Sequence, residues 1–164
     1  MKSPVSLNLK MSELIYDVQN KTYLTGRSLN DGTNHTRIAN MQANDDDENS
    51  AQILRSITMA NSVLRNRLSE YIESSDVTTN NDSLSTDEDI TFTLSMPSNF
   101  NGAVTKTLGE AAHQFIVATA IADWFAITAK GETYDYSGVA EESIRVIEDS
   151  LCKRSRPVRP ESHP

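Results

Sequence analysis

The segment from Phe115 to Ile127 constrains this chain more than any other, because it is apolar on almost every side of a helix, with Asp123 as its one charged residue. Such a helix has to be covered by other elements on several sides. The segment is shorter than the roughly 20 apolar residues that a bilayer requires. We therefore predict a helix from just after Gly102 to about Ala129 at the centre of a soluble core, and no membrane-spanning segment.

The rest of the core must come from a few segments, since only 37% of the 164 residues are hydrophobic. Apolar residues recur at three-to-four spacing over 46–73 and 136–153, and also after Ser12, a candidate N-cap, as far as Gly26. The short break at 130–132 makes the last two helices an antiparallel hairpin. The predicted core residues are Leu54, Ile57, Leu64, Leu68, Phe115, Ile116, Ile121, Trp124, Phe125, Ile144, Ile147 and Leu151.

Two segments alternate apolar and polar residues, as half-buried strands do. The clearer one runs from Ile90 to Met96 and is ended by Pro97, and the other runs from Val5 to Met11. The strand at 90–96 has two candidate partners, the segment Val77–Thr79 across a long loop and the strand near the N-terminus. Because a two-stranded ribbon is marginal in water, we expect it to lie against helices or a neighbouring subunit.

These elements predict a mainly α fold, an antiparallel helical bundle of about four helices with a small β-strand or hairpin element and extended terminal arms. Residues 1–152 form one helical domain, with polar insertions near 27–45 and 74–89 that show no clear period. Residues 153–164, which we call the basic arm, contain three prolines and are predicted to be extended.

Charge is distributed unevenly along the chain, whose net charge is −8. From residue 151 onward there are four basic residues and one acidic residue, whereas residues 1–150 hold 11 basic and 22 acidic ones. The acidic body argues against non-specific nucleic-acid binding over the whole molecule. The basic arm is either a solvated end or a docking segment, and its arginines suit contacts with carboxylates or phosphates.

Residues with catalytic or metal-binding potential are scattered. The run Asp45–Glu48 lacks the ligand spacing of a calcium loop and is interpreted as the acidic start of a helix. Asp123 is either a buried acid with a raised pKa or, more often in such a position, a structural hydrogen-bonding or ion-pair residue. The histidines His35, His113 and His163 show no metal-ligand spacing.

Cys152 is the one cysteine, which excludes an internal disulfide and a cysteine-based zinc site. No nucleophile elbow or phosphate-binding glycine run is present in the sequence. We therefore predict no catalytic, cofactor-binding or metal site, and no enzymatic activity.

Several longer segments carry a resemblance. The block from Asp89 to Pro160 reads DITFTLSMPSNFN, then AAHQFIVATAIADWFAIT, then VAEESIRVIEDSLCKRSRPVRP. It resembles the C-terminal part of small head–tail connector (adaptor or neck-ring) proteins of tailed bacteriophages and prophages. Those proteins likewise have a strand, a long helix ending in a Trp-aromatic pair (here Trp124 and Phe125), an amphipathic helix and an Arg/Lys/Pro end. The segments SELIYDVQNKTYLTGRS and ANDDDENSAQILRSITMANSVLRNRLSEYI are similar to relatives from phages of gut bacteria.

The resemblance implies a structural virion protein made in the host cytoplasm. Such proteins form a ring, often of twelve copies, that binds the portal protein on one side and the next neck or tail protein on the other. DNA passes through the lumen without sequence-specific binding, and an acidic channel wall would let it slide. The residues we predict to bind partners are Lys153, Arg154, Arg156 and Arg159 of the basic arm, together with Ile90 and Phe92 of the strand.

Other functional classes stay open at this point. A cytoplasmic helical partner-binding or assembly protein would be a monomer or dimer in solution with a free arm. A DNA-packaging component would bind DNA in a salt-sensitive way. An enzyme would reveal itself only by a reaction.

Overall fold

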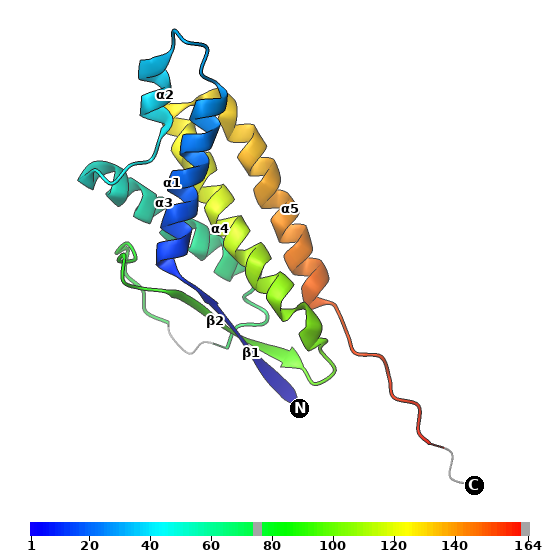
Figure 1. The fold of residues 1–164 in the computed structure, drawn as a ribbon. Helices are drawn as coiled ribbons and strands as arrows, with labels where there is room; N and C mark the ends of the chain where they lie inside the picture. The colour runs from blue at the N-terminus through cyan, green and yellow to red at the C-terminus, as the bar shows by residue number, and fades with distance from the viewer. Residues whose placement is uncertain (74–76, 162–164) are drawn as a thin grey trace.

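A computed structural model describes residues 1–73 and 77–161, and it is mainly helical (Figure 1). The helices and strands, in chain order, are β1 (Lys2–Leu9), α1 (Met11–Ser28), α2 (His35–Met41), α3 (Asp47–Arg67), β2 (Ile90–Pro97), α4 (Thr105–Thr128) and α5 (Thr133–Leu151). Short 3-10 turns, Gly102–Val104 and Lys130–Glu132, precede α4 and α5. The mainly α prediction is confirmed, with five helices and one two-stranded antiparallel sheet in place of a bundle of about four helices.

Helix α4 lies at the centre of the molecule, where it contacts α1, α2, α3, α5 and β1 (Figure 1). Half of its residues are buried, and they point in all directions around the helix axis: Leu108, Ala111, Ala112, Phe115, Ile116, Val117, Ala118, Ala120, Ile121, Ala122, Trp124 and Phe125. Helix α5 packs along α4 after the 3-10 turn, as the predicted antiparallel hairpin. Other elements therefore remove most of the apolar segment from water, whereas Ile127 near the end of the helix is 63% exposed.

The span Gly102–Thr128 is long and apolar enough to cross a membrane by length and composition alone. A central core helix satisfies the same criteria. Most of the apolar window is buried inside the protein, and its surroundings are the other helices and β1. The burial pattern therefore fits the core helix that the sequence predicts.

The sheet pairs β1 with β2 in antiparallel register, with Leu9 opposite Ile90 and Lys2 opposite Pro97. The alternation of the β2 sequence is reproduced in its burial, since every second side chain lies in the core. Of the two predicted partners, the strand near the N-terminus is thus the one that pairs with β2. Val77, in the alternative partner segment, is 98% exposed.

The start of helix α1 depends on a contact far along the sequence. Its first backbone N–H, at Met11, donates to Asp89 Oδ1 at 3.1 Å, just before β2 begins. The predicted N-cap Ser12 is wrong, because Met11 already belongs to the helix and Lys10 occupies the cap position without a side-chain bond. An acceptor supplied from 78 residues away replaces the local cap and ties the helix to the sheet.

The polar insertion near 27–45, for which the sequence shows no clear period, is helical in its second half. Residues 35–41 form α2, and both Met41 and Ala43 are fully buried. The Trp124 indole N–H donates to the Met41 carbonyl at 2.8 Å, and Ala43 N–H donates to Thr22 Oγ1 at 3.1 Å. The second half of this segment therefore packs against α1 and α4 and is not a free loop.

Helix α3 ends at Arg67, earlier than the predicted end near residue 73. The chain turns after Leu68, and the Tyr71 carbonyl accepts a hydrogen bond from Ser95 N–H at 2.7 Å. Ile72 forms a bridge with Leu94. These contacts satisfy backbone groups on the outer edge of β2, which a longer helix would leave unpaired.

The second polar insertion has no regular structure between 77 and 89, and residues 74–76 lie outside the described part of the chain. It is nevertheless attached to α3. Arg55 Nη1 donates to the Asn81 carbonyl at 2.7 Å, and Leu84 N–H donates to Thr58 Oγ1 at 3.0 Å.

The predicted core is confirmed in its central part. Phe115, Ile116, Ile121, Trp124 and Phe125 are buried, as are Ile57, Leu64, Leu68, Ile147 and Leu151, whereas Leu54 and Ile144 are partly buried at its border.

The fold gives a stability prediction for Trp124, which is 5% exposed. Trp124→Ala is expected to lower the free energy of unfolding by about 3–5 kcal/mol, because it leaves a cavity beside α2. Trp124→Phe retains most of the ring and leaves the Met41 carbonyl without its donor, which costs about 1–3 kcal/mol. Urea denaturation followed by circular dichroism measures both. Tyr134→Ala, at an 82% exposed position, is the control, and equal effects for all three variants would contradict the packing described.

Candidate partner-binding surfaces

The basic arm leaves the body where α5 ends, and its first residues are fixed. Asn101 N–H donates to the Lys153 carbonyl at 3.2 Å, and Ser155 N–H donates to the Asn99 carbonyl at 2.8 Å. Arg154 Nη1 donates to the Leu151 carbonyl at 2.8 Å. The root of the arm thus extends to Ser155.

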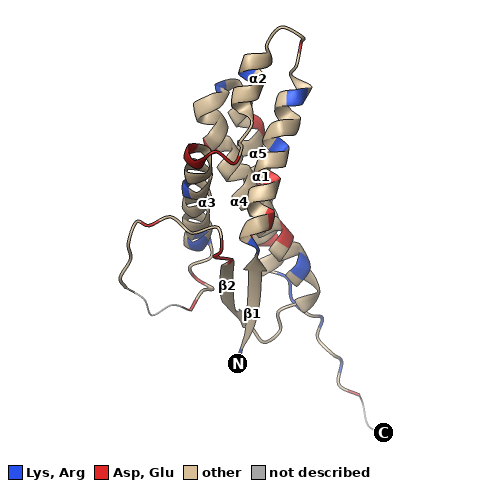
Figure 2. Cartoon of the chain, turned by 60° about the vertical axis from the view of Figure 1, so that its left-hand side comes forward, with Lys and Arg blue, Asp and Glu red and all other residues tan. Residues whose placement is uncertain are grey.

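From 156 to 161 the arm is extended and every residue is exposed (Figure 1). Within the described residues, no hydrogen bond or ion pair joins Arg156 or Arg159 to the body. Lys153 differs, since its ammonium lies 3.2 Å from Asp149 Oδ2. Figure 2 shows the arm pointing away from the helices. Two of the four predicted arm residues, Arg156 and Arg159, therefore present their charge to solvent, while Arg154 holds the root.

The strand residues predicted to bind a partner have a different environment. Ile90 and Phe92 are buried in the core of the chain itself. The Arg65 guanidinium lies 4.6 Å above the Phe92 ring, and its Nη2 donates to the Thr91 carbonyl at 2.9 Å. The side chains of Ile90 and Phe92 thus pack in the core beneath the sheet, so these two residues are not part of the exposed partner surface.

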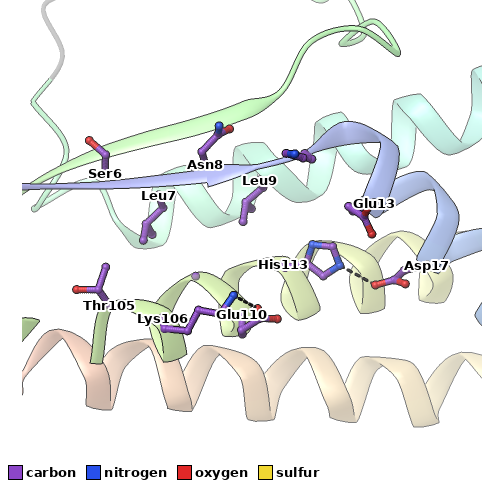
Figure 3. Close-up of a pocket in the computed structure, with 12 residues that line it drawn as sticks. Ser6, Leu7, Asn8, Leu9, Glu13, Asp17, Thr105, Lys106, Glu110 and His113 are labelled. Atoms are coloured by element: carbon purple, nitrogen blue, oxygen red, sulfur yellow. Dashed lines mark hydrogen bonds and ion pairs between the residues drawn. The ribbon is translucent and has the colours of Figure 1, made fainter. Parts of the chain in front are cut away.

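A first groove, which we call the strand groove, lies between β1, the start of α1 and the first half of α4 (Figure 3). Its volume is about 540 Å³. Two close polar pairs lie along it: His113 Nε2 is 2.7 Å from Asp17 Oδ2, and Lys106 Nζ is 2.8 Å from Glu110 Oε1. The first pair joins α4 to α1, and the second follows the surface of α4.

The contact between Lys106 and Glu110 shifts the pKa of both side chains. The hydrogen bond from Lys106, and then its positive charge, lower the pKa of Glu110 below its ordinary value of 4.5. The same contact raises the pKa of Lys106. Glu110 is therefore ionised over the whole neutral range.

The edge of β1 beside the strand groove has free backbone groups. Pro4 has no N–H, and the N–H of Ser95 opposite it is donated to Tyr71, so this pair exchanges no hydrogen bonds. Because the ladder alternates, Ser6 and Asn8 also direct their backbone groups away from β2. No other segment within 1–73 and 77–161 pairs with them. β1 is thus an open edge strand.

A second groove, which we call the hairpin groove, lies between α4 and α5 and has a volume of about 310 Å³. Its apolar surface comes from Ala111 of α4 and from Val139 and Val146 of α5. Glu110 and Glu142 contribute carboxylates from opposite helices, and no basic side chain is among its lining residues. The groove therefore combines an apolar floor with two carboxylates at its rim, each of which lies near a basic side chain of its own helix.

The other candidates from the sequence have structural environments. Asp123 is exposed and accepts a hydrogen bond from Ser56 Oγ of α3, so the buried-acid alternative is wrong. Asp47 and Glu48 occupy the first turn of α3, as expected of an acidic helix start. Cys152 is exposed. Across the described residues, no three His, Cys, Asp or Glu side chains lie close enough together to hold a metal ion.

Neither groove was predicted from the sequence. Each needs side chains from separate elements, and only the three-to-four spacing of Thr107, Glu110 and Gln114 and of Val139, Glu142 and Val146 indicates a shared helix face. Comparison with protein-family models, with curated proteins and with solved structures gives no match.

The Lys106–Glu110 contact leads to a pH prediction. In carboxyl-detected NMR, Glu110 is expected to titrate below pH 4.5, and Lys106→Met is expected to raise its pKa towards that value. A lowered folded-state pKa means that the pair stabilises the protein above pH 4.5 and that this contribution disappears as the pH falls through the folded-state pKa. Lys106→Arg, which keeps the positive charge, is the control. A Glu110 pKa at or above 4.5 in the unaltered protein would show that the contact is absent in solution.

Proposed function

We propose that this protein is a structural subunit of the neck of a tailed bacteriophage virion, where it forms a ring in the head–tail connector around the DNA channel. The proposal starts from the sequence resemblance to adaptor and neck-ring proteins. The observation that carries it furthest is the basic arm, which is extended, exposed from 156 to 161 and positively charged on an acidic body. An exposed segment rich in arginine suits attachment to the carboxylates or phosphates of another molecule.

Electrostatics gives the arm a role in such a ring. Residues 1–150 hold 11 basic and 22 acidic residues, so neighbouring copies of the body repel one another. An arm that reaches an acidic neighbour offsets this repulsion. Each exposed ion pair contributes only about 0.2–1 kcal/mol, so the stabilisation depends on several contacts repeated around the ring.

The proposed partners follow from the same reasoning. A homo-oligomeric ring, of twelve copies by resemblance, would contact the portal protein and the next neck or tail protein. The acidic body suits a lumen through which DNA slides without being held. No enzymatic step and no cofactor is part of this proposal.

Arm truncation tests the proposed function. A chain ending at Ser155 keeps both backbone hydrogen bonds of the arm root, so its unfolding midpoint is expected to match that of the full chain. A chain ending at Leu151 loses both and is expected to be less stable by about 1–3 kcal/mol. Both are expected to fold and to attach to particles more weakly than the full chain, with a smaller deficit at high salt because salt screens the ion pairs that the arm supplies.

Quantitative mass spectrometry of purified particles gives the copy number of each chain. A full chain present in about a dozen copies, as the resemblance implies, with a reduced number for the chain ending at Ser155, supports the proposal. Incorporation of the truncated chain at the normal copy number would contradict the role of the arm. Absence of the full chain from particles would favour the assembly-protein alternative, and salt-sensitive DNA binding by the purified protein would favour a packaging component.

A further inference from the structure

We propose that the basic arm of one copy binds in the hairpin groove of a neighbouring copy, with its prolines on the apolar floor and its arginines at the two carboxylates of the rim. This inference rests on the proposed function, because it assigns the contact that joins subunits of the ring. It names a binding site for the arm, which the sequence left undecided between a neighbouring subunit and the portal.

The arm has a three-residue period. Arg156 and Arg159 are three residues apart, and so are Pro157 and Pro160. Polyproline II helix has three residues per turn and rises about 9 Å per turn, and prolines favour it. In this conformation the two prolines lie along one side of the arm and the two arginines along another. The arm therefore presents an apolar ridge beside a row of positive charge.

The hairpin groove is complementary to this pattern. Ala111, Val139 and Val146 offer apolar surface for the prolines and Val158, which is 92% exposed in the free chain. Glu110 and Glu142 lie on opposite helices and offer carboxylates to the arginines. Proline-rich segments bind apolar grooves at low entropic cost because they are already extended.

Both carboxylates already have partners within their own helices, at 2.8 Å from Lys106 to Glu110 and at 3.4 Å from Arg145 to Glu142. All four of these side chains are more than 60% exposed, so the existing pairs are weak and can be exchanged for contacts with the arm. When the arm covers the apolar floor, the burial of apolar surface adds to the binding free energy. The existing solvent-exposed ion pairs bury no such surface.

The open edge of β1 is a less suitable site. A segment that adds to a strand alternates its N–H groups with a period of two. Since Pro157 and Pro160 are an odd number of residues apart, one of them would face β1 without a donor. The strand groove holds Lys10 and Lys106 together with the carboxylates Glu13, Asp17 and Glu110, so charge alone does not separate the two sites. The period of the arm favours the hairpin groove.

The arm reaches the groove of another copy rather than its own. The bridge between Phe100 and Arg154, with the Ser155–Asn99 hydrogen bond, holds its root and directs the exposed part away from α4 and α5 (Figure 1).

Disulfide trapping tests the contact in the full chain. Cys152 is the one cysteine, so Cys152→Ser provides a cysteine-free background. One protein carries Val158→Cys in the arm, and a second, tagged protein carries Gln114→Cys in the hairpin groove. Mild oxidation of the mixture is expected to give a disulfide-linked heterodimer. Asn8→Cys in the strand groove and Ser62→Cys, at an exposed position of α3, replace Gln114→Cys in matched reactions.

Charge neutralisation adds a second readout. Glu110→Gln with Glu142→Gln on the groove protein removes two exposed ion pairs and is expected to reduce trapping roughly 2- to 30-fold. Glu141→Gln, an exposed carboxylate of α5 that does not line the groove, is the matched control and is expected to leave trapping unchanged. Circular dichroism confirms that each variant is folded.

Each outcome decides the proposal. Preferential trapping at residue 114 that weakens with the double Gln variant supports it. Equal trapping at 62, stronger trapping at 8, insensitivity to the double variant or no heterodimer overturns it. Particles that contain the full chain while trapping at 114 fails would overturn the docking site alone. Specific trapping by a chain that is absent from particles would overturn the neck function and leave the docking site standing.

Discussion

The burial of α4 is the constraint on which the rest of the structure depends. A helix that is apolar on all sides is stable in water only when other elements enclose it, and here four helices and β1 share that task. The paired helix α5 covers one side, α1 and α3 cover others, and α2 closes the end near Trp124. The small sheet is stable for the same reason, because its inner side chains belong to the core that surrounds α4.

A few polar contacts position the elements that hydrophobic burial alone would leave free to slide. Trp124 fixes α2 through one hydrogen bond to Met41, and Asp89 fixes the start of α1 against the start of β2. The Ser155–Asn99 bond fixes where the basic arm departs. Each of these hydrogen bonds adds only modestly to the free energy of unfolding. Their importance here is that each fixes the orientation of the segment it holds. The direction of the arm leaves the charges of Arg156 and Arg159 in solvent, as the proposed contact with another molecule requires.

Periodicity was sufficient to predict that α3, α4, α5 and both strands exist, because each carries its own apolar pattern at a period of 3.6 or 2. It placed the first strand at Val5–Met11, whereas β1 spans Lys2–Leu9 and Met11 begins α1. It could not predict α2, in which Ile38 and Met41 are too few for a pattern and whose stability comes from Trp124 and α1. The same limit applies to the early end of α3, which is decided by the unpaired edge of β2. The grooves have no local signal at all, since each needs two elements brought together by the fold. The charge contrast between body and arm, by comparison, can be read directly from the composition.

In the structure, a body organised around α4 carries an arm whose residues 156–161 make no hydrogen bond or ion pair with the body among the described residues. Hydrogen exchange of the purified full chain measures this directly, because it reports the stability of each segment separately. We expect amides of 111–125 to exchange only through global unfolding, and the non-proline amides of 156–161 to exchange at the rate of an unstructured peptide when the protein is monomeric. Exchange of 111–125 that is as fast as that of 35–41, or strong protection of the arm in the monomer, would contradict it.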